Sequence, residues 1–169
     1  TIPNALTILR IMLVPVLVVV FYLPFQNHLL VAAVIFGLAA ITDWFDGYLA
    51  RRLGQMTALG AFLDPVADKL MVAIALVLLV ERHDTLLFTL PACVIIGREI
   101  VVSALREWMA ELGERTSVAV SFIGKVKTGF QMVAITALLA IDPATDKDWQ
   151  VAICYLVFYA AAVLTLWSM

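Results

Sequence analysis

The stretch that decides the fold reads DWFDGYLAR at residues 43–51 and GAFLDPVADK at residues 60–69. It places four aspartates in a chain that is 64% hydrophobic and only 14% charged: Asp43, Asp46, Asp64 and Asp68. Soluble domains are about 45–50% apolar and about 25% charged, so we expect an integral membrane protein. A carboxylate inside a bilayer costs about 2.5–3.5 kcal/mol on insertion scales. Four carboxylates in one segment therefore indicate a functional site.

Outward from this stretch, the chain divides into apolar segments long enough to cross a membrane, which takes about 20 residues. Six spans are expected, near Leu6–Pro24, Leu29–Ala50, Ala61–Val80, Thr85–Trp108, Phe122–Ile141 and Trp149–Trp167. The 169 residues contain no sequence repeat, and we expect one domain over residues 1–169. The predicted fold class is an all-α bundle of six transmembrane helices.

Charged residues interrupt these spans at one end only. If the helices run up and down, one side carries Arg10, Arg51, Arg52, Lys69, Arg98, Arg106, Arg115, Lys125 and Lys127. The opposite loops carry only Arg82 and Lys147 as basic residues. The positive-inside rule makes the charged side cytoplasmic and predicts that both termini lie there. The net charge of −2 gives no reason to expect a nucleic-acid partner.

Helical spacing gathers the aspartates into two stripes. Residues three, four, seven or eight apart share a helix face, so one stripe holds Asp43, Asp46, Gly47, Ala50 and Arg51. The second stripe holds Gly60, Asp64 and Asp68. Two antiparallel helices joined by the short connection at 52–59 would turn these stripes toward each other. Asn4, Thr7 and Arg10 recur at a spacing of three, and they form either an interfacial anchor or a polar face toward a ligand.

Three interpretations compete for the acidic stripes. The aspartates could pair with Arg51, Arg52 and Lys69, but Arg52 and Lys69 point about 100° away from their neighbours on the stripes. They could line the path of a divalent-cation transporter, which leaves the later basic cluster unexplained. They could instead hold two divalent metal ions, because carboxylate oxygens suit Mg²⁺ or Mn²⁺. Two such ions can clamp the attacking and leaving oxygens of a phosphoryl-type displacement.

The spacing D-x₂-D-G-x₂-A-R-x₈-G-x₃-D-x₃-D resembles the signature of the CDP-alcohol phosphotransferases at all eight fixed positions. The resemblance implies a six-helix membrane fold, usually homodimeric, with a site open to the cytosol. It also implies that an alcohol attacks the β-phosphorus of a CDP-linked lipid and that CMP leaves. By the same resemblance, Asp43, Asp46, Asp64 and Asp68 hold two Mg²⁺ or Mn²⁺ ions, and Asp68 is also the general base. The implied CDP-lipid contacts are Asn4, Thr7, Arg10, Gly47, Ala50, Arg51 and Gly60.

The second half of the chain bears on the acceptor alcohol. Arg98 and Arg106 are eight residues apart and share a helix face, while Lys125 and Lys127 begin the next span on the same side. Convergent arginines and lysines suit a phosphate monoester, although basic residues also anchor helices to anionic headgroups. Arg98 fits anchoring poorly because it lies within an apolar run.

The segments Arg98–Ile100 and Ser103–Gly113 are similar to those of the bacterial branch of the family whose acceptor is sn-glycerol 3-phosphate. This resemblance implies CDP-diacylglycerol as the donor and the bacterial cytoplasmic membrane, with its lipids, as the surroundings. Arg98, Arg106, Lys125 and Lys127 are the predicted ligands of the acceptor phosphate. The alternatives are another acceptor, such as inositol phosphate, and a divalent-cation transporter.

Overall fold

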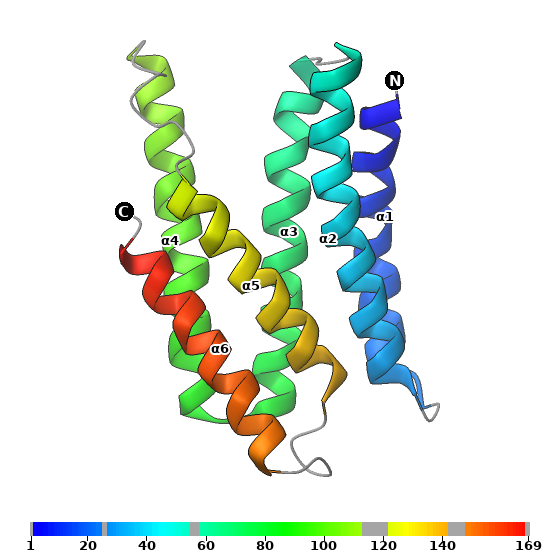
Figure 1. Ribbon diagram of the computed structural model, residues 1–169, viewed down its shortest axis with the longest axis vertical. Coiled ribbons are helices and arrows are strands. Elements are labelled where there is room, and N and C mark those ends of the chain that lie inside the picture. The colour runs from blue at the N-terminus through cyan, green and yellow to red at the C-terminus, as the bar shows by residue number, and fades with distance from the viewer. Residues whose placement is uncertain (1, 25–26, 55–57, 113–121, 142–147, 168–169) are drawn as a thin grey trace.

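The computed structural model describes the backbone of residues 2–24, 27–54, 58–112, 122–141 and 148–167. Within these ranges the side chains at 2–3, 44, 46–47, 49–51, 53, 58–65 and 122–126 are not described. The described residues form six helices and no strand: α1 (Ile2–Tyr22), α2 (His28–Leu53), α3 (Ala58–His83), α4 (Leu86–Glu111), α5 (Phe122–Ala140) and α6 (Asp148–Trp167). Consecutive helices run in opposite directions (Figure 1). The predicted all-helical bundle is confirmed, and α1, α2 and α3 are each longer than predicted.

Local chemistry explains where several helices begin and end. Gly54 follows the last residue of α2 with a φ of 64°, a left-handed conformation that glycine adopts readily because it lacks a Cβ. Asp84 has a φ of 45° between α3 and α4, and aspartate tolerates this region better than most residues. Thr85 then caps α4, since its side chain accepts a hydrogen bond from the Leu87 amide at 3.3 Å.

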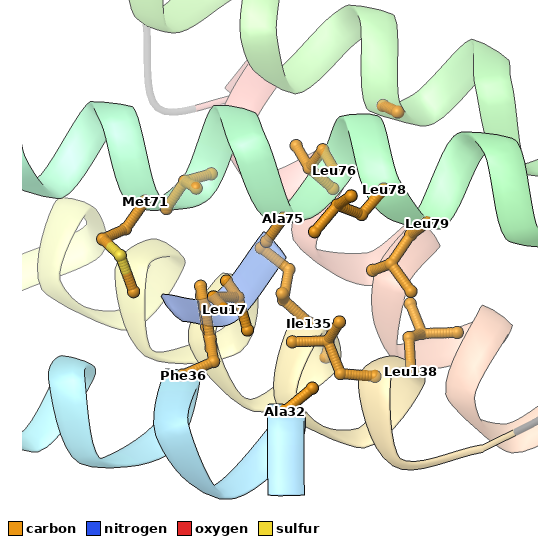
Figure 2. Packing of buried hydrophobic residues seen from close by; sticks show 14 of the residues in the cluster. Leu17, Ala32, Phe36, Met71, Ala75, Leu76, Leu78, Leu79, Ile135 and Leu138 are labelled. Atoms are coloured by element: carbon orange, nitrogen blue, oxygen red, sulfur yellow. The ribbon is translucent and has the colours of Figure 1, made fainter. Parts of the chain in front are cut away.

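The hydrophobic core lies where α1, α2, α3 and α5 meet. Leu17, Phe36, Leu76 and Ile135 come from these four helices, and each is at most 1% exposed. Figure 2 shows their side chains pointing into the same space between the helices. The ring of Phe88 on α4 stacks on the ring of Phe158 on α6, and this pair extends the core toward these two helices.

The outer surface of the bundle is also apolar, as a bilayer requires. Met12, Val77, Leu156 and Trp167 are each more than 60% exposed. Among the described residues, three helical segments are long and apolar enough to cross a membrane: Asn4–Tyr22, Leu86–Glu111 and Asp148–Trp167. Shorter apolar stretches of described residues lie in α2 and α5, at His28–Asp43 and Lys127–Ala140.

The packing leaves one region more open than the rest. α1 packs against α2 and α3, while α5 packs against α2 and α6. α3 contacts α4 and α5 less extensively than it contacts α1. The start of α3, the end of α4 and the start of α5 lie toward the same end of the bundle (Figure 1), so the charged segments border this more open region.

Candidate active site

A buried arginine on α1 contacts the first aspartate of the acidic stretch. Arg10 Nη1 lies 2.8 Å from Asp43 Oδ1 on α2, and Arg10 Nη2 donates to Thr7 Oγ1 at 3.4 Å. Arg10 is 1% exposed and Thr7 is fully buried. The polar stripe predicted on the first span therefore points inward, toward the acidic stretch. Asn4, one turn earlier, is half-buried.

Two of the cations named in the electrostatic alternative, Arg52 and Lys69, contact groups other than the aspartates. Arg52 donates to the Tyr48 hydroxyl at 3.0 Å on its own helix. Lys69 Nζ lies 3.8 Å from Glu99 Oε2 on α4. Arg10, from a different helix, meets Asp43, and residue spacing along α2 and α3 alone does not predict this pair.

Asp43 and Asp68 lie on the same small cavity, lined by Arg10, Phe36, Ala39, Ala40, Asp43, Asp68, Met71 and Met132. Its volume of about 10 Å³ is on the scale of one water molecule. Carboxylates from two neighbouring helices thus approach one another, as the two-stripe prediction requires. Their oxygen donors fit a hard divalent cation such as Mg²⁺ or Mn²⁺.

The remaining members of the acidic stripes can be placed only by backbone. Asp46, Gly47, Ala50 and Arg51 lie in the last turns of α2, and Gly60 and Asp64 lie in the first turns of α3, with side chains outside the described set. Among the described side chains there is no cluster of three or more potential metal ligands. The four-aspartate ligand set remains a prediction.

A larger cavity of about 280 Å³ opens between α3, α4 and α5. Its polar lining is Asp68, Lys69, Arg98, Glu99, Arg106, Lys127, Thr128 and Gln131. Apolar side chains complete the wall: Val72, Ala73, Ile96, Ile100, Val102 and Met132. Asp68 and Met132 line both cavities, so the acidic and basic regions adjoin at Asp68.

The larger cavity carries an excess of positive charge. Four cationic side chains face two carboxylates in its lining. Glu99 bridges two of the cations, with Oε1 3.0 Å from Lys127 Nζ and Oε2 3.8 Å from Lys69 Nζ. Buried Arg98 Nε has no hydrogen-bond partner among the described residues. Because buried polar atoms are nearly always paired, this atom indicates a site suited to an anionic ligand.

Three of the four predicted phosphate ligands, Arg98, Arg106 and Lys127, therefore share one cavity with Asp68. Lys125 lies in the first turn of α5 and its side chain is outside the described set. Lys69 and Gln131 also line this cavity, although they were not among the predicted site residues. Gln131 follows Lys127 by four residues, so helical periodicity along α5 could have identified it.

Comparisons with known proteins identify the family of the chain. The family model for CDP-alcohol phosphatidyltransferase matches residues 1–167. A protein of Salmonella choleraesuis named CDP-diacylglycerol–glycerol-3-phosphate 3-phosphatidyltransferase is 60% identical over 99% of this chain and 90% of its own length. Proteins of the same name from Shigella flexneri and Escherichia coli K12 are each 57% identical over the same shares of the two chains.

Proposed function

Because the chain belongs to the CDP-alcohol phosphatidyltransferase family, we propose that it transfers a phosphatidyl group from CDP-diacylglycerol to sn-glycerol 3-phosphate in phospholipid biosynthesis. The similar proteins carry the name of this reaction. The observation that supports it most directly is the cavity that the Asp68 carboxylate lines together with Arg98, Arg106 and Lys127. A phosphate monoester with a free hydroxyl matches that combination of charges.

In the proposed reaction the phosphate group of glycerol 3-phosphate lies among the cations. The hydroxyl at the other end of the glycerol faces Asp68. Guanidinium and ammonium groups bind phosphate oxygens through charge-assisted hydrogen bonds. Asp68 takes the hydroxyl proton as the oxygen attacks the β-phosphorus of the CDP-lipid. The new oxygen–phosphorus bond forms as the bond to the bridging oxygen breaks, and CMP leaves with that oxygen.

The proposed metal ligands are Asp43, Asp46, Asp64 and Asp68. Bound Mg²⁺ or Mn²⁺ would stabilise negative charge on the diphosphate and on the leaving CMP. Asp43 and Asp68, which line one small cavity, supply carboxylate oxygens suited to these ions. The pairing of Arg10 with Asp43 offsets part of the negative charge that the aspartates would otherwise concentrate.

The nucleotide end of the donor is assigned to the acidic stretch and the amino-terminal polar face. The proposed CDP-lipid residues are Asn4, Thr7, Arg10, Gly47, Ala50, Arg51 and Gly60. Thr7 and Arg10 are buried beside Asp43, which supports a role in shaping this site. We propose that Arg10 acts mainly by orienting Asp43.

We further propose a single-domain, homodimeric protein of the bacterial cytoplasmic membrane, with the active site and both termini on the cytoplasmic side. The chain is a membrane protein by its family and its apolar helices. The excess of Arg and Lys on the side of the acidic stretch supports the orientation.

The function is tested by adding CDP-diacylglycerol and Mg²⁺ to the purified protein in detergent and measuring CMP release with different acceptors. Glycerol 3-phosphate is expected to support release, while inositol phosphate and serine are not. Release with inositol phosphate alone would move the assignment to another acceptor. Metal-dependent ion flux in liposomes without CMP release would favour the transporter.

A further inference from the structure

Among the described residues that line the larger cavity, Gln131 is the one side-chain amide. It is neutral, so the attraction of cations to a phosphate does not explain why it is there. It lies on α5, one turn beyond Lys127, and is 4% exposed. Buried amides in a membrane-spanning helix are unfavourable unless they are hydrogen-bonded. The reason for a glutamine at this depth therefore has to come from its hydrogen bonds.

The hydrogen bonds of Thr165 determine which way the Gln131 amide points. Thr165 Oγ1 on α6 donates its only proton to the Ala161 carbonyl at 2.7 Å. Gln131 Nε2 lies 2.8 Å from the same Oγ1. Since a hydroxyl has one proton, Thr165 can only accept from Gln131, and the amide must present its NH₂ group to Thr165. The carbonyl oxygen Oε1 is then the atom left for the cavity.

An oriented carbonyl oxygen differs from the cationic groups that the acceptor phosphate would use. Lys69, Arg98, Arg106 and Lys127 supply donors, which suit phosphate oxygens. Oε1 of Gln131 can only accept, so its natural partner is a hydroxyl. Of the two carboxylates in the lining, Asp68 is assigned to the attacking hydroxyl and Glu99 bridges Lys69 and Lys127.

The spacing along α5 fits a small phosphorylated polyol. Lys127 and Gln131 share a helix face, and four residues at 1.5 Å each separate them by about 6 Å along the axis. Side chains one turn apart on the same face can both contact one small ligand that carries a phosphate and a nearby hydroxyl. With the phosphate at Lys127 and the far hydroxyl at Asp68, the middle hydroxyl would lie toward Gln131.

We propose that Gln131, oriented by Thr165, accepts a hydrogen bond from the non-reacting hydroxyl of the acceptor and so selects a phosphorylated polyol over an analogue without that hydroxyl. This inference rests on the proposed function, because it assigns a role within the same acceptor site. Gln131 is a specificity-determining residue in this scheme and takes no part in the proton transfer.

The test compares two acceptors, glycerol 3-phosphate and 1,3-propanediol monophosphate, which lacks only the middle hydroxyl. CMP release by the wild-type protein is expected to show a kcat/KM about tenfold higher for glycerol 3-phosphate, the scale of one neutral hydrogen bond. Gln131→Met keeps the length of the side chain but removes the acceptor. It is expected to lower kcat/KM for glycerol 3-phosphate to the value of the deoxy analogue. The kcat/KM for the analogue and the KM for CDP-diacylglycerol are expected to stay unchanged.

Two further variants make the result specific. Thr165→Val removes the group that orients the amide and is expected to reduce the selectivity without abolishing turnover, and it gives the same comparison if Gln131→Met fails to fold. Thr136→Val is the matched control, because Thr136 is also on α5, donates to the Met132 carbonyl at 2.7 Å, and lies outside the described lining of the cavity. It should leave both acceptors unaffected.

The outcomes separate this inference from the proposed function. A wild-type protein that uses both acceptors equally, or a Gln131→Met variant that slows both by the same factor, would overturn the role of Gln131 and leave the reaction standing. A folded wild-type protein that releases no CMP with either acceptor would overturn the proposed function itself.

Discussion

At the scale of single residues, Asp68 is the side chain on which the proposed chemistry depends. It lines both the small acidic cavity and the larger basic cavity, so under the proposed function it would contact the donor and the acceptor at once. A residue in that position would take the proton of the attacking hydroxyl while it shares the small cavity with Asp43.

Asp68→Asn is expected to lower kcat for CMP release by at least about 10²-fold, the usual scale of a positioned acid–base group. The amide keeps the size of the side chain but has neither the basicity nor the charge of the carboxylate. Circular dichroism and gel filtration in detergent check the fold. Appreciable turnover by the folded variant would remove Asp68 from the role of base.

Arg98→Ala is expected to raise the KM for glycerol 3-phosphate about tenfold or more, because a charge-assisted contact to phosphate is lost, while the KM for CDP-diacylglycerol stays the same. The matched control is Arg82→Ala. Arg82 is in the last turn of α3, and its guanidinium lies 5.0 Å from the ring centre of Phe21. An equal change in both variants would show that Arg98 does not contact the acceptor.

At the scale of helices, two ion-pair systems join the elements around the site, and they differ in burial. Arg10 of α1 is 1% exposed and meets Asp43 of α2, whose side chain is 33% exposed. Glu99 of α4 joins Lys69 of α3 to Lys127 of α5, and the three side chains are 12–28% exposed. A hydrogen bond between charged groups that includes a fully buried side chain contributes more to stability than an ion pair between partly exposed side chains, which solvent screens.

Arg10→Met is therefore expected to lower the stability of the bundle by about 1.5–3 kcal/mol, the scale of a hydrogen bond to a charged group. Glu99→Gln is expected to cost less than about 1 kcal/mol, as is usual for partly exposed ion pairs. Thermal unfolding in detergent under matched conditions measures both. A larger loss in Glu99→Gln than in Arg10→Met would reverse this ranking of the two contacts.

At the scale of the whole molecule, the basic residues are unevenly distributed, because nine of the 11 Lys and Arg residues belong by sequence to the side of the acidic stretch. Positive charge at the end of the acidic stretch indicates that this end faces the cytoplasm. This orientation would give the site access to water-soluble acceptors made in the cell, and the apolar outer surface would remain in the bilayer.

The orientation is tested with single cysteines in a background that lacks Cys93 and Cys154. Glu111→Cys lies at the exposed end of α4, and Asn27→Cys lies before α2 at the opposite end of the bundle. In intact cells whose outer membrane has been made permeable, an impermeant thiol reagent is expected to label position 27 and not position 111. The reverse pattern would contradict the assigned orientation.

The sequence alone was sufficient to predict the helices and the class of chemistry. Apolar length predicts spans because a helix must satisfy its own backbone in lipid, and helical spacing put the four aspartates on two faces. It also placed Arg98 and Arg106 on one face of α4. These are local consequences of periodicity, so they do not depend on which helix packs against which.

Only the tertiary structure decided which faces meet. The ion pair of Arg10 with Asp43, the bridge from Glu99 to two lysines, and the orientation of Gln131 by Thr165 each join different helices. No spacing rule within one helix specifies the rotation and neighbours of another, because these follow from the packing of the whole core. The four aspartates between residues 43 and 68 thus predicted a functional site. The packing of α3, α4 and α5 determined the shape of the cavity beside it.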